Sequence, residues 1–202
     1  MDVAWIGCSI VLQGYITMID LGRLRKIRSD ELELMLQWRN EPSVRENMYT
    51  QHEITLSEHV DWWRKISAIE RFKYFMYEFQ QVPLGIVSFS DIDGTSSNAS
   101  WAFYASPDAP RGTGSKMEVL ALDQAFKVMG LHKLYCEVLA FNKPVLRLHE
   151  KFGFKVEGLF KDQFRSSVDF ADVYRLGLFA SDWNDARNRI LDKLTNPNRN
   201  QQ

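Results

Sequence analysis

Cysteine, charge of one sign and long apolar runs are all scarce in this 202-residue chain. Its two cysteines, Cys8 and Cys136, form no CxxC or other metal-ligand spacing, so we expect no bound metal and a reducing, cytoplasmic location. Lys and Arg number 25 against 26 Asp and Glu, so the charge does not indicate a nucleic-acid partner. No apolar run approaches the ~20 residues that cross a bilayer, so we expect no membrane partner.

The composition that remains is ordinary for a globular protein, with 45% hydrophobic and 25% charged residues. We predict one domain over residues 21–180, large enough to bury a core without metal or disulfides. Residues 1–20 are expected to be a leader or a mis-assigned start, with Met18 as the alternative first residue. They lack the positive charge and continuous apolar run of a secretory signal. Residues 181–202 are predicted to form a terminal helix and a disordered tail.

Helical and strand patterns alternate along this domain. Capping boxes, in which Asp30 and Thr55 are each followed three residues later by Glu, predict two early helices. Further helices are expected over 115–129 and, capped by Asn142, over 143–153. Strands are predicted at 21–28, 71–80, 83–91, 98–105, 134–140, 154–164 and 170–180. This order, mostly antiparallel in its first half, predicts a single α+β domain.

A glycine-bearing loop, Ala109-Pro110-Arg111-Gly112-Thr113-Gly114-Ser115, lies between a predicted strand and a predicted helix. Glycines let the backbone approach a ligand, and the free N–H groups of a first helical turn form an anion site. The spacing fits neither the dinucleotide fingerprint GxGxxG nor the Lys-[Ser/Thr] ending of a P-loop. Taken alone, the loop favours a purely structural turn.

A second sequence block, further along the chain, favours a functional role for this loop. Cys136-Glu137-Val138-Leu139-Ala140-Phe141-Asn142 reads as a strand entering a capped helix, followed by Leu148-His149-Glu150-Lys151-Phe152-Gly153-Phe154. Together the two blocks resemble the GNAT superfamily of acetyl-coenzyme A-dependent N-acetyltransferases, in order and in separation. The pyrophosphate loop of that family has the form [Gln/Arg]-x-x-Gly-x-[Gly/Ala], and Ala109 departs from its leading residue.

The resemblance implies a fold and a co-substrate. The fold is a mixed, mostly antiparallel sheet flanked by helices, with splayed fourth and fifth strands, and the co-substrate is acetyl-CoA. The pyrophosphate would be held by Arg111, Gly112, Thr113, Gly114 and Ser115. Asn142 would contact the pantetheine arm.

Glu137 lies within the apolar stretch Leu134–Ala140, where an ionised group is costly to bury unless it is partnered or functional. One interpretation is an edge-facing carboxylate paired with Lys or Arg. The resemblance implies the other, a general base that acts through water on the substrate ammonium.

His149 stands where the family usually has a tyrosine as general acid. Helical spacing places it on the face of Val145, Leu148 and Phe152, so a satisfied core histidine is the alternative. A phenol of pKa near ~10 matches a thiolate leaving group, whereas an imidazole of pKa near ~6.5 is mostly neutral at pH 7. We predict direct acyl transfer with His149 as the candidate acid.

The first third of the domain is expected to bind the acceptor. Trp38-Arg39-Asn40 followed by Val44-Arg45 is common to the Rim-like branch, which acetylates protein N-termini. The further Met48-Tyr49 and His59-x-x-Trp62 pattern resembles the sugar-nucleotide acetyltransferases of pseudaminic acid biosynthesis, on the route to flagellin glycosylation. An arginine suits a diphosphate, and aromatic faces suit uracil or a sugar. By this resemblance the acceptor site would be lined by Arg39, Met48, Tyr49, His59, Trp62 and Tyr104.

The leading hypothesis is therefore an enzyme that acetylates the 4-amino group of a UDP-linked amino-deoxy sugar, UDP-4-amino-4,6-dideoxy-N-acetyl-β-L-altrosamine in that branch. A Rim-like protein N-terminal acetyltransferase is the first alternative. A non-catalytic acetyl-CoA-binding module is the second, because a histidine replaces the usual tyrosine. A homodimer is compatible with each of these.

Overall fold

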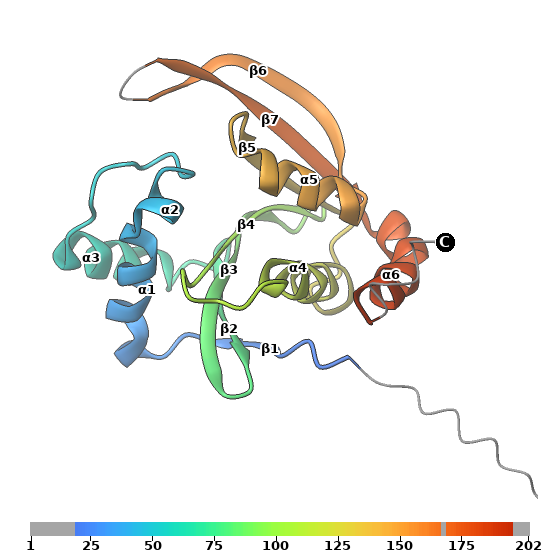
Figure 1. The fold of residues 1–202 in the computed structure, drawn as a ribbon, viewed down its shortest axis with the longest axis horizontal. Helices are drawn as coiled ribbons and strands as arrows, with labels where there is room; N and C mark the ends of the chain where they lie inside the picture. Colours follow the sequence, from blue (N-terminus) through green and yellow to red (C-terminus); the bar gives the residue numbers. More distant parts are fainter. Residues whose placement is uncertain (1–18, 167–168, 196–202) are drawn as a thin grey trace, which may run out of the picture.

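The computed structural model describes residues 19–166 and 169–195, and its strands form one seven-stranded sheet in the order β1-β2-β3-β4-β5-β7-β6 (Figure 1). The strands are β1 (Arg23–Lys26), β2 (Lys73–Phe79), β3 (Val82–Asp93), β4 (Asn98–Ala105), β5 (Lys133–Leu139), β6 (Lys155–Arg165) and β7 (Phe170–Phe179). All neighbours pair antiparallel except β4 and β5, which are parallel. The expected mixed, mostly antiparallel sheet is confirmed. The predictions made for residues 1–18 and for the tail after Thr195 lie outside the described residues.

Strands β4 and β5 separate soon after they meet. They pair only from Asn98 to Ser100 on β4, opposite Lys133 to Tyr135 on β5. Both strands then continue for several residues, and Figure 1 shows them diverging. The predicted splay is confirmed. It leaves an opening through the middle of the sheet, and the backbone along that opening is free to meet a ligand.

Helices cover both faces of the sheet. On one face lie α1 (Leu32–Asn40), α2 (Pro42–Arg45) and α3 (Leu56–Ile66); on the other lie α4 (Thr113–Asp123), α5 (Lys143–Phe152) and α6 (Ala180–Thr195). Alternation along β2 separates the two faces, because Met76 packs with Met35 of α1 whereas Tyr77 joins the larger core with Met117 of α4. Trp183 of α6 is fully buried in that same core, so the terminal helix packs directly on the sheet.

Two helix starts were predicted from capping boxes, and one of them is wrong. The box at Thr55 is confirmed at the start of α3. Asp30 does not cap α1, which follows a 3-10 turn at Ser29–Glu31. Glu31 instead accepts the backbone N–H of Arg28 at 2.9 Å, and its carboxylate also takes two hydrogen bonds from Arg25. The hydrogen bonds from Arg25 therefore explain why Glu31, rather than Asp30, closes the turn.

Helix α4 also differs from its prediction. It begins at Thr113, two residues before the expected start, and changes to one turn of π-helix at Gln124–Val128 before Gly130. Its early start places the glycine loop directly on the first helical turn. Within the described ranges, no helix combines the length and the apolar character needed to cross a membrane.

Candidate active site

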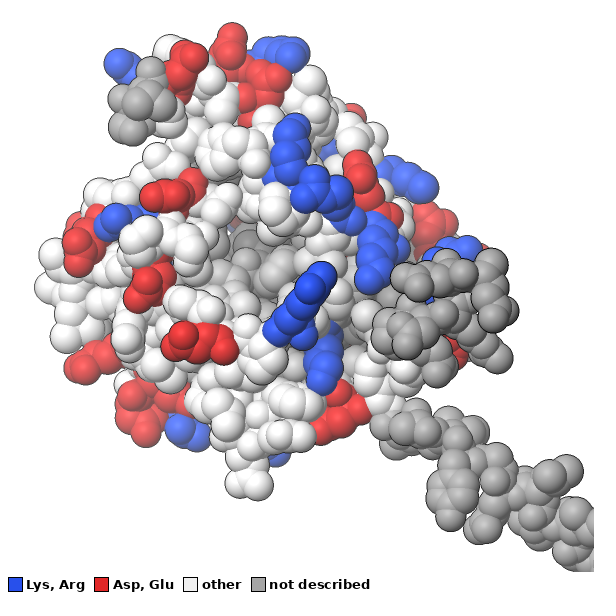
Figure 2. Space-filling model, in the orientation of Figure 1, with Lys and Arg blue, Asp and Glu red and all other residues white. Residues whose placement is uncertain are grey.

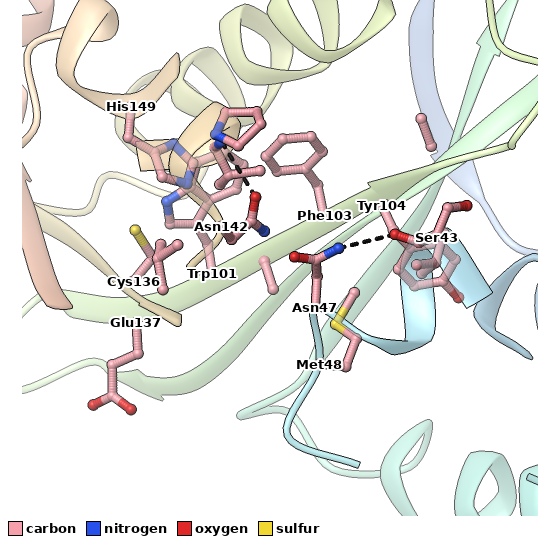
Figure 3. Close-up of a pocket in the computed structure, with 16 residues that line it drawn as sticks. Ser43, Asn47, Met48, Trp101, Phe103, Tyr104, Cys136, Glu137, Asn142 and His149 are labelled. Atoms are coloured by element: carbon pink, nitrogen blue, oxygen red, sulfur yellow. Dashed lines mark hydrogen bonds between the residues drawn. The ribbon is translucent and has the colours of Figure 1, made fainter. Parts of the chain in front are cut away.

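A cleft of about 360 Å³ occupies the opening between the separated strands (Figure 3). Its wall comes from the segment after α2, from β4, from β5 and from the start of α5. The side chains that carry polar chemistry there include Asn47, Tyr104, Glu137, Asn142 and His149. Residues that the sequence placed in separate motifs thus meet in one cavity.

The start of α4 lies next to this cleft and has the geometry expected of an anion site. Gly112 is the N-cap and has a φ of 93°, a left-handed conformation that favours glycine. No side chain caps this helix end, and the Thr113 hydroxyl is used internally, donating to the Pro110 carbonyl at 2.7 Å. The helix N-terminus therefore offers backbone N–H groups and its positive dipole end, which fit a pyrophosphate.

The surroundings of this loop suit a phosphorylated ligand. Figure 2 shows a hollow in the middle of this face, with Lys and Arg side chains gathered on the side formed by α4 and α5. A Cβ added at Gly114 would come within 3.4 Å of Leu148 Cδ2, so the start of α4 approaches α5 closely. Arg111 is exposed, so its guanidinium is accessible to a phosphate bound at this loop.

Asn142 has the cap position that the sequence predicts. Its Oδ1 accepts the Val145 backbone N–H at 3.4 Å, and its side chain lines the cleft. Because Oδ1 is engaged, the amide N–H groups are what Asn142 offers to a ligand. An amide-bearing chain such as pantetheine has carbonyls to receive them.

His149 lies in the cleft wall and is 3% exposed. Its Nδ1 is 2.9 Å from Oε1 of Glu118, which is fully buried on α4. Burial alone would lower the pKa of His149, but the Glu118 carboxylate outweighs burial, and the pKa of His149 is raised to about 10. The prediction that His149 lies on the apolar face of its helix is confirmed. The histidine also contacts Glu118, an acid that the sequence did not reveal.

Glu137 has two polar partners. Arg175 Nη1 on the neighbouring strand β7 donates to its Oε1 at 3.2 Å, and the Tyr49 hydroxyl donates to its Oε2 at 2.8 Å. The ion pair fits the interpretation of a partnered carboxylate on the strand. Glu137 nevertheless lines the cleft and is one-third exposed, so both sequence-based interpretations describe part of its environment.

Alternation along β5 sends these groups to opposite sides of the sheet. Cys136 points into the larger core beside His149, whereas Figure 3 shows the Glu137 carboxylate directed away from them. The candidate acid therefore shares the face of α4 and the anion loop. The candidate base shares the opposite face with the segment that carries Tyr49.

A second cavity, of about 420 Å³, adjoins the cleft, since Met48, Ala102 and Tyr104 line both. Its wall contains five of the six predicted acceptor residues: Arg39, Met48, His59, Trp62 and Tyr104. The sixth, Tyr49, is about half exposed and lies at Glu137 instead, with its ring edge against Phe164. The sequence-predicted acceptor set is thus largely brought together.

Two polar side chains in this second cavity have atoms without a protein partner. Arg39 Nη2 donates to the Thr50 carbonyl at 2.9 Å, but its buried Nη1 has no hydrogen-bond partner among the described residues. Nε2 of His59, a residue only 3% exposed, also lacks one in that part of the chain. Burial lowers the pKa of His59, and the nearby Arg39 lowers it further, so its imidazole is neutral. Buried polar atoms left in this state need a partner that the described residues do not supply, such as an ordered water or a ligand.

The aromatic residues of the second cavity are held by one another. The Trp62 ring stacks on His59 with centroids 5.2 Å apart and meets the edge of Tyr74 at 5.3 Å. Tyr104 reaches back to the Met35 carbonyl at 3.5 Å, and burial raises the pKa of its phenol well above the usual range. These contacts fix the cavity wall before any ligand binds.

Sequence reasoning missed Glu118, Arg175 and the Tyr49–Glu137 hydrogen bond. The burial of Glu118 could have been predicted from its neighbours. Apolar residues surround it on every side of the helix, and a helix that is apolar all round is buried; these residues are Met117, Val119, Ala121 and Leu122. Arg175 and Tyr49 had no such signal, since their contacts depend on tertiary packing. In residues 19–166 and 169–195, no cluster of His, Cys, Asp or Glu is arranged to bind a metal.

Comparison with known proteins places the site in context. The family model described as an acetyltransferase (GNAT) domain matches residues 23–155. The acetyltransferase PseH of Campylobacter jejuni (strain 81-176) is 26% identical over 159 residues, which are 79% of this chain and 99% of that protein. The spermidine N(1)-acetyltransferase of Escherichia coli K12 is 25% identical over 158 residues, 78% of this chain and 85% of that protein.

A solved structure has the same fold. It is the spermidine N-acetyltransferase of Vibrio cholerae in complex with CoA and spermine, with a TM-score of 0.76 and 22% identity. The match covers 80% of this chain and 96% of that one.

Proposed function

Because the chain belongs to the GNAT acetyltransferase family, we propose that it acetylates the 4-amino group of a UDP-linked amino-deoxy sugar. Its relatives include both PseH and spermidine acetyltransferases, so the acceptor is the open question. The sequence motif at Met48-Tyr49 and His59-x-x-Trp62 resembles the pseudaminic acid branch, and the second cavity is the place where that resemblance can be tested. The cytoplasmic location and the homodimer stay predictions.

The unpaired Arg39 guanidinium carries this proposal. Its buried Nη1 atom lies at the wall of the second cavity and has no hydrogen-bond acceptor in the described structure, whereas Nη2 donates to the Thr50 carbonyl. Arginine keeps its charge in proteins and binds phosphate in a bidentate manner. The only carboxylate lining this cavity among the described residues is Glu58, which the Thr55 backbone and hydroxyl already engage at 2.7 and 2.8 Å. A cation with neutral aromatic neighbours suits a nucleotide diphosphate better than a polyamine.

Each part of the chain then has a task in the reaction. Acetyl-CoA, when bound, supplies an acetyl group activated as a thioester. The α4 N-terminus and Asn142 hold it in the cleft, and the separated edge of β4 offers backbone donors near the reacting carbonyl. Glu137 faces the acceptor side, where it removes the proton of the ammonium through water.

Acceptor specificity can be tested by CoA release with three acceptors: the UDP-4-amino sugar, spermidine and a peptide with a free N-terminus. We expect turnover with the UDP-sugar and none above background with the other two. Faster turnover with spermidine would replace the proposed acceptor by a polyamine. Faster turnover with the peptide would favour the Rim-like alternative.

The variant Arg39→Gln tests whether Arg39 binds the acceptor. It should raise KM for the UDP-sugar about tenfold or more, because one charged hydrogen bond contributes roughly 1.5–3 kcal/mol. The control is Arg64→Gln on α3, since Arg64 is 73% exposed and its ion pair in the described structure is with Asp61 three residues away. Equal effects of the two variants would remove Arg39 from the acceptor site.

A further inference from the structure

Glu118 is a carboxylate in an apolar core. It lies on α4 with no exposed surface, between the fully buried Met117 and Val119. Its Oε1 meets His149 Nδ1 at 2.9 Å, and its Oε2 has no partner within the described structure. Burying an ionisable group with half of its hydrogen-bonding capacity unused costs several kcal/mol, roughly. A purely structural position would be better filled by an apolar residue.

The groups around His149 explain why Glu118 dominates its charge. Trp101 and Phe154 contact the imidazole at centroid distances of 5.2 Å, and Phe103 does so at 6.0 Å. These contacts from β4 and from the residue before β6 are uncharged. From β5 the Cys136 thiol lies beside the ring, and Lys151 on α5 acts on Glu118. Glu118 is the single carboxylate in contact with the imidazole among the described residues.

We propose that Glu118 is a positioning residue that keeps Nε2 of His149 protonated and directed into the cleft, so that His149 can replace the usual tyrosine as acid. This inference rests on the proposed acetyl transfer. Because Nδ1 is bound to Glu118, Nε2 is the ring nitrogen left to face the reacting sulfur. The cleft wall contains His149, and the anion loop that holds the coenzyme lies on the same face of the sheet.

Two arrangements of the protons give the same result at Nε2. If Glu118 is ionised, His149 is an imidazolium with hydrogens on both nitrogens. If the proton resides on Glu118, its O–H donates to Nδ1 and the neutral ring carries its hydrogen on Nε2. Burial raises the pKa of Glu118 while Glu118 raises that of His149, so the pair shares one proton at neutral pH. Nε2 therefore remains a donor in either case.

Every bond, electron pair and proton of the acetyl-transfer step can be assigned. The amine nitrogen forms a bond to the acetyl carbon as the carbon–sulfur bond breaks, and the electron pair of that bond goes to sulfur. The Nε2 proton moves to the sulfur, which leaves as a thiol. His149 then becomes neutral with its remaining hydrogen on Nδ1, donated to an ionised Glu118. The acceptor nitrogen loses two protons: the first goes through water to Glu137 before the attack, and the second goes to solvent as the amide forms. Solvent then returns a proton to Nε2, and Glu137 releases its proton to solvent.

The first test is a proton NMR titration of the free protein, without acetyl donor or acceptor. The chain has four histidines, so His149→Tyr identifies the His149 imidazole signal by its disappearance. We expect His149 to titrate well above its ordinary value of 6.5, and Glu118→Gln to lower its pKa below 6.5. The glutamine amide still accepts from Nδ1, so the fold is retained. A wild-type His149 whose Nε2 carries no proton at pH 7, as read from its ¹⁵N chemical shift, overturns the proposal without any variant.

The second test separates positioning from structure. Glu118→Gln should reduce kcat about 10²-fold while KM for acetyl-CoA changes less than about threefold. In the His149→Tyr background, the same substitution should change kcat less than about threefold, because a phenol needs no carboxylate to hold its proton. Equal losses in both backgrounds would show a structural role and overturn the proposal. The control is Glu150→Gln, which removes an exposed carboxylate next to His149 in sequence.

The two tests distinguish the failure of this proposal from a wrong acceptor. The titration needs neither substrate, so it reads the Glu118–His149 pair even if the UDP-sugar is not turned over. If another amine is the acceptor, the kinetic comparison is made with that amine.

Discussion

The Tyr49 hydroxyl donates a hydrogen bond of 2.8 Å to Glu137 Oε2. This contact ties the acceptor-side segment to the strand that carries the candidate base. Arg175 takes the other carboxylate oxygen, so Glu137 is fixed between two donors at the mouth of the cleft. Burial raises the pKa of Tyr49, and the adjacent Glu137 carboxylate raises it further, so the phenol remains a donor throughout the working pH range.

Replacing Glu137 by Gln should reduce kcat by about 10²-fold or more, the usual contribution of a general base. The amide keeps the shape, and its oxygen can accept from Arg175 while its NH2 group donates to the Tyr49 hydroxyl oxygen, but it cannot take a proton from the substrate ammonium. Affinity for CoA, measured by calorimetry, should stay within about twofold of wild type, since the anion loop lies on the other face. Unchanged turnover would exclude Glu137 as the base.

Tyr49→Phe tests the hydrogen bond rather than the proton transfer. The ring and its edge contact with Phe164 are kept, with centroids 5.8 Å apart, so only the hydroxyl is lost. We expect a modest fall in kcat of about three- to tenfold, because Arg175 still holds the carboxylate and the loss is therefore smaller than the roughly 1.5–3 kcal/mol of a full hydrogen bond to a charged group. A loss as large as that of Glu137→Gln would mean that Tyr49 itself moves the proton.

The features of the fold and the site that the sequence could predict depend on local motifs. The glycine loop, Asn142 and the Thr55 capping box depend on residues within a few positions of one another, and all three have the predicted geometry. The splay of β4 and β5 followed from family resemblance, and the pairing that stops at Ser100 confirms it. Periodicity alone would not have separated two adjacent strands.

Contacts between residues far apart in the chain explain what the sequence could not predict. Glu118 and His149 are 31 residues apart on different helices, and Tyr49 is 88 residues from Glu137. A single sequence contains no spacing rule for such pairs. The wrong cap at Asp30 has the same origin, because Arg25 selects Glu31 through hydrogen bonds that local propensity does not describe.

Gly112→Ala should weaken coenzyme binding. Gly112 has a φ of 93°, which costs a residue with a Cβ roughly 1–2 kcal/mol, so the loop would shift and misplace its N–H groups. We expect KM for acetyl-CoA to rise about tenfold with kcat nearly unchanged. An added Cβ would meet no atom within 4 Å, so the effect would come from the backbone alone. The control is Gly94→Ala in the β3–β4 turn, where a Cβ is equally free and φ is not positive.

Stability depends on a cluster far from the cleft. Arg25, on β1, donates to Glu31 at 2.7 and 2.8 Å and to Glu78 at 2.6 Å. Its side chain is 16% exposed, and both carboxylates are nearly buried. Hydrogen bonds from Arg25 are the main cause that lowers the pKa of each carboxyl below its ordinary value of 4.5.

Removing the guanidinium leaves Glu78 paired with Arg23 and Glu31 paired with Arg28. Arg25→Gln should therefore lower the free energy of unfolding by about 2 kcal/mol at pH 7, less than for a carboxylate left without any partner. Since the folded pKa values lie below 4.5, this stabilisation is complete above pH 4.5 and is lost as the pH falls through the folded values. The difference between wild type and variant in urea unfolding should therefore shrink from pH 7 to pH 3. Arg64→Gln, an exposed pair, should change stability by less than about 0.5 kcal/mol. A difference that stays constant down to pH 3 would mean that packing of the arginine stem, rather than its charge, stabilises the fold.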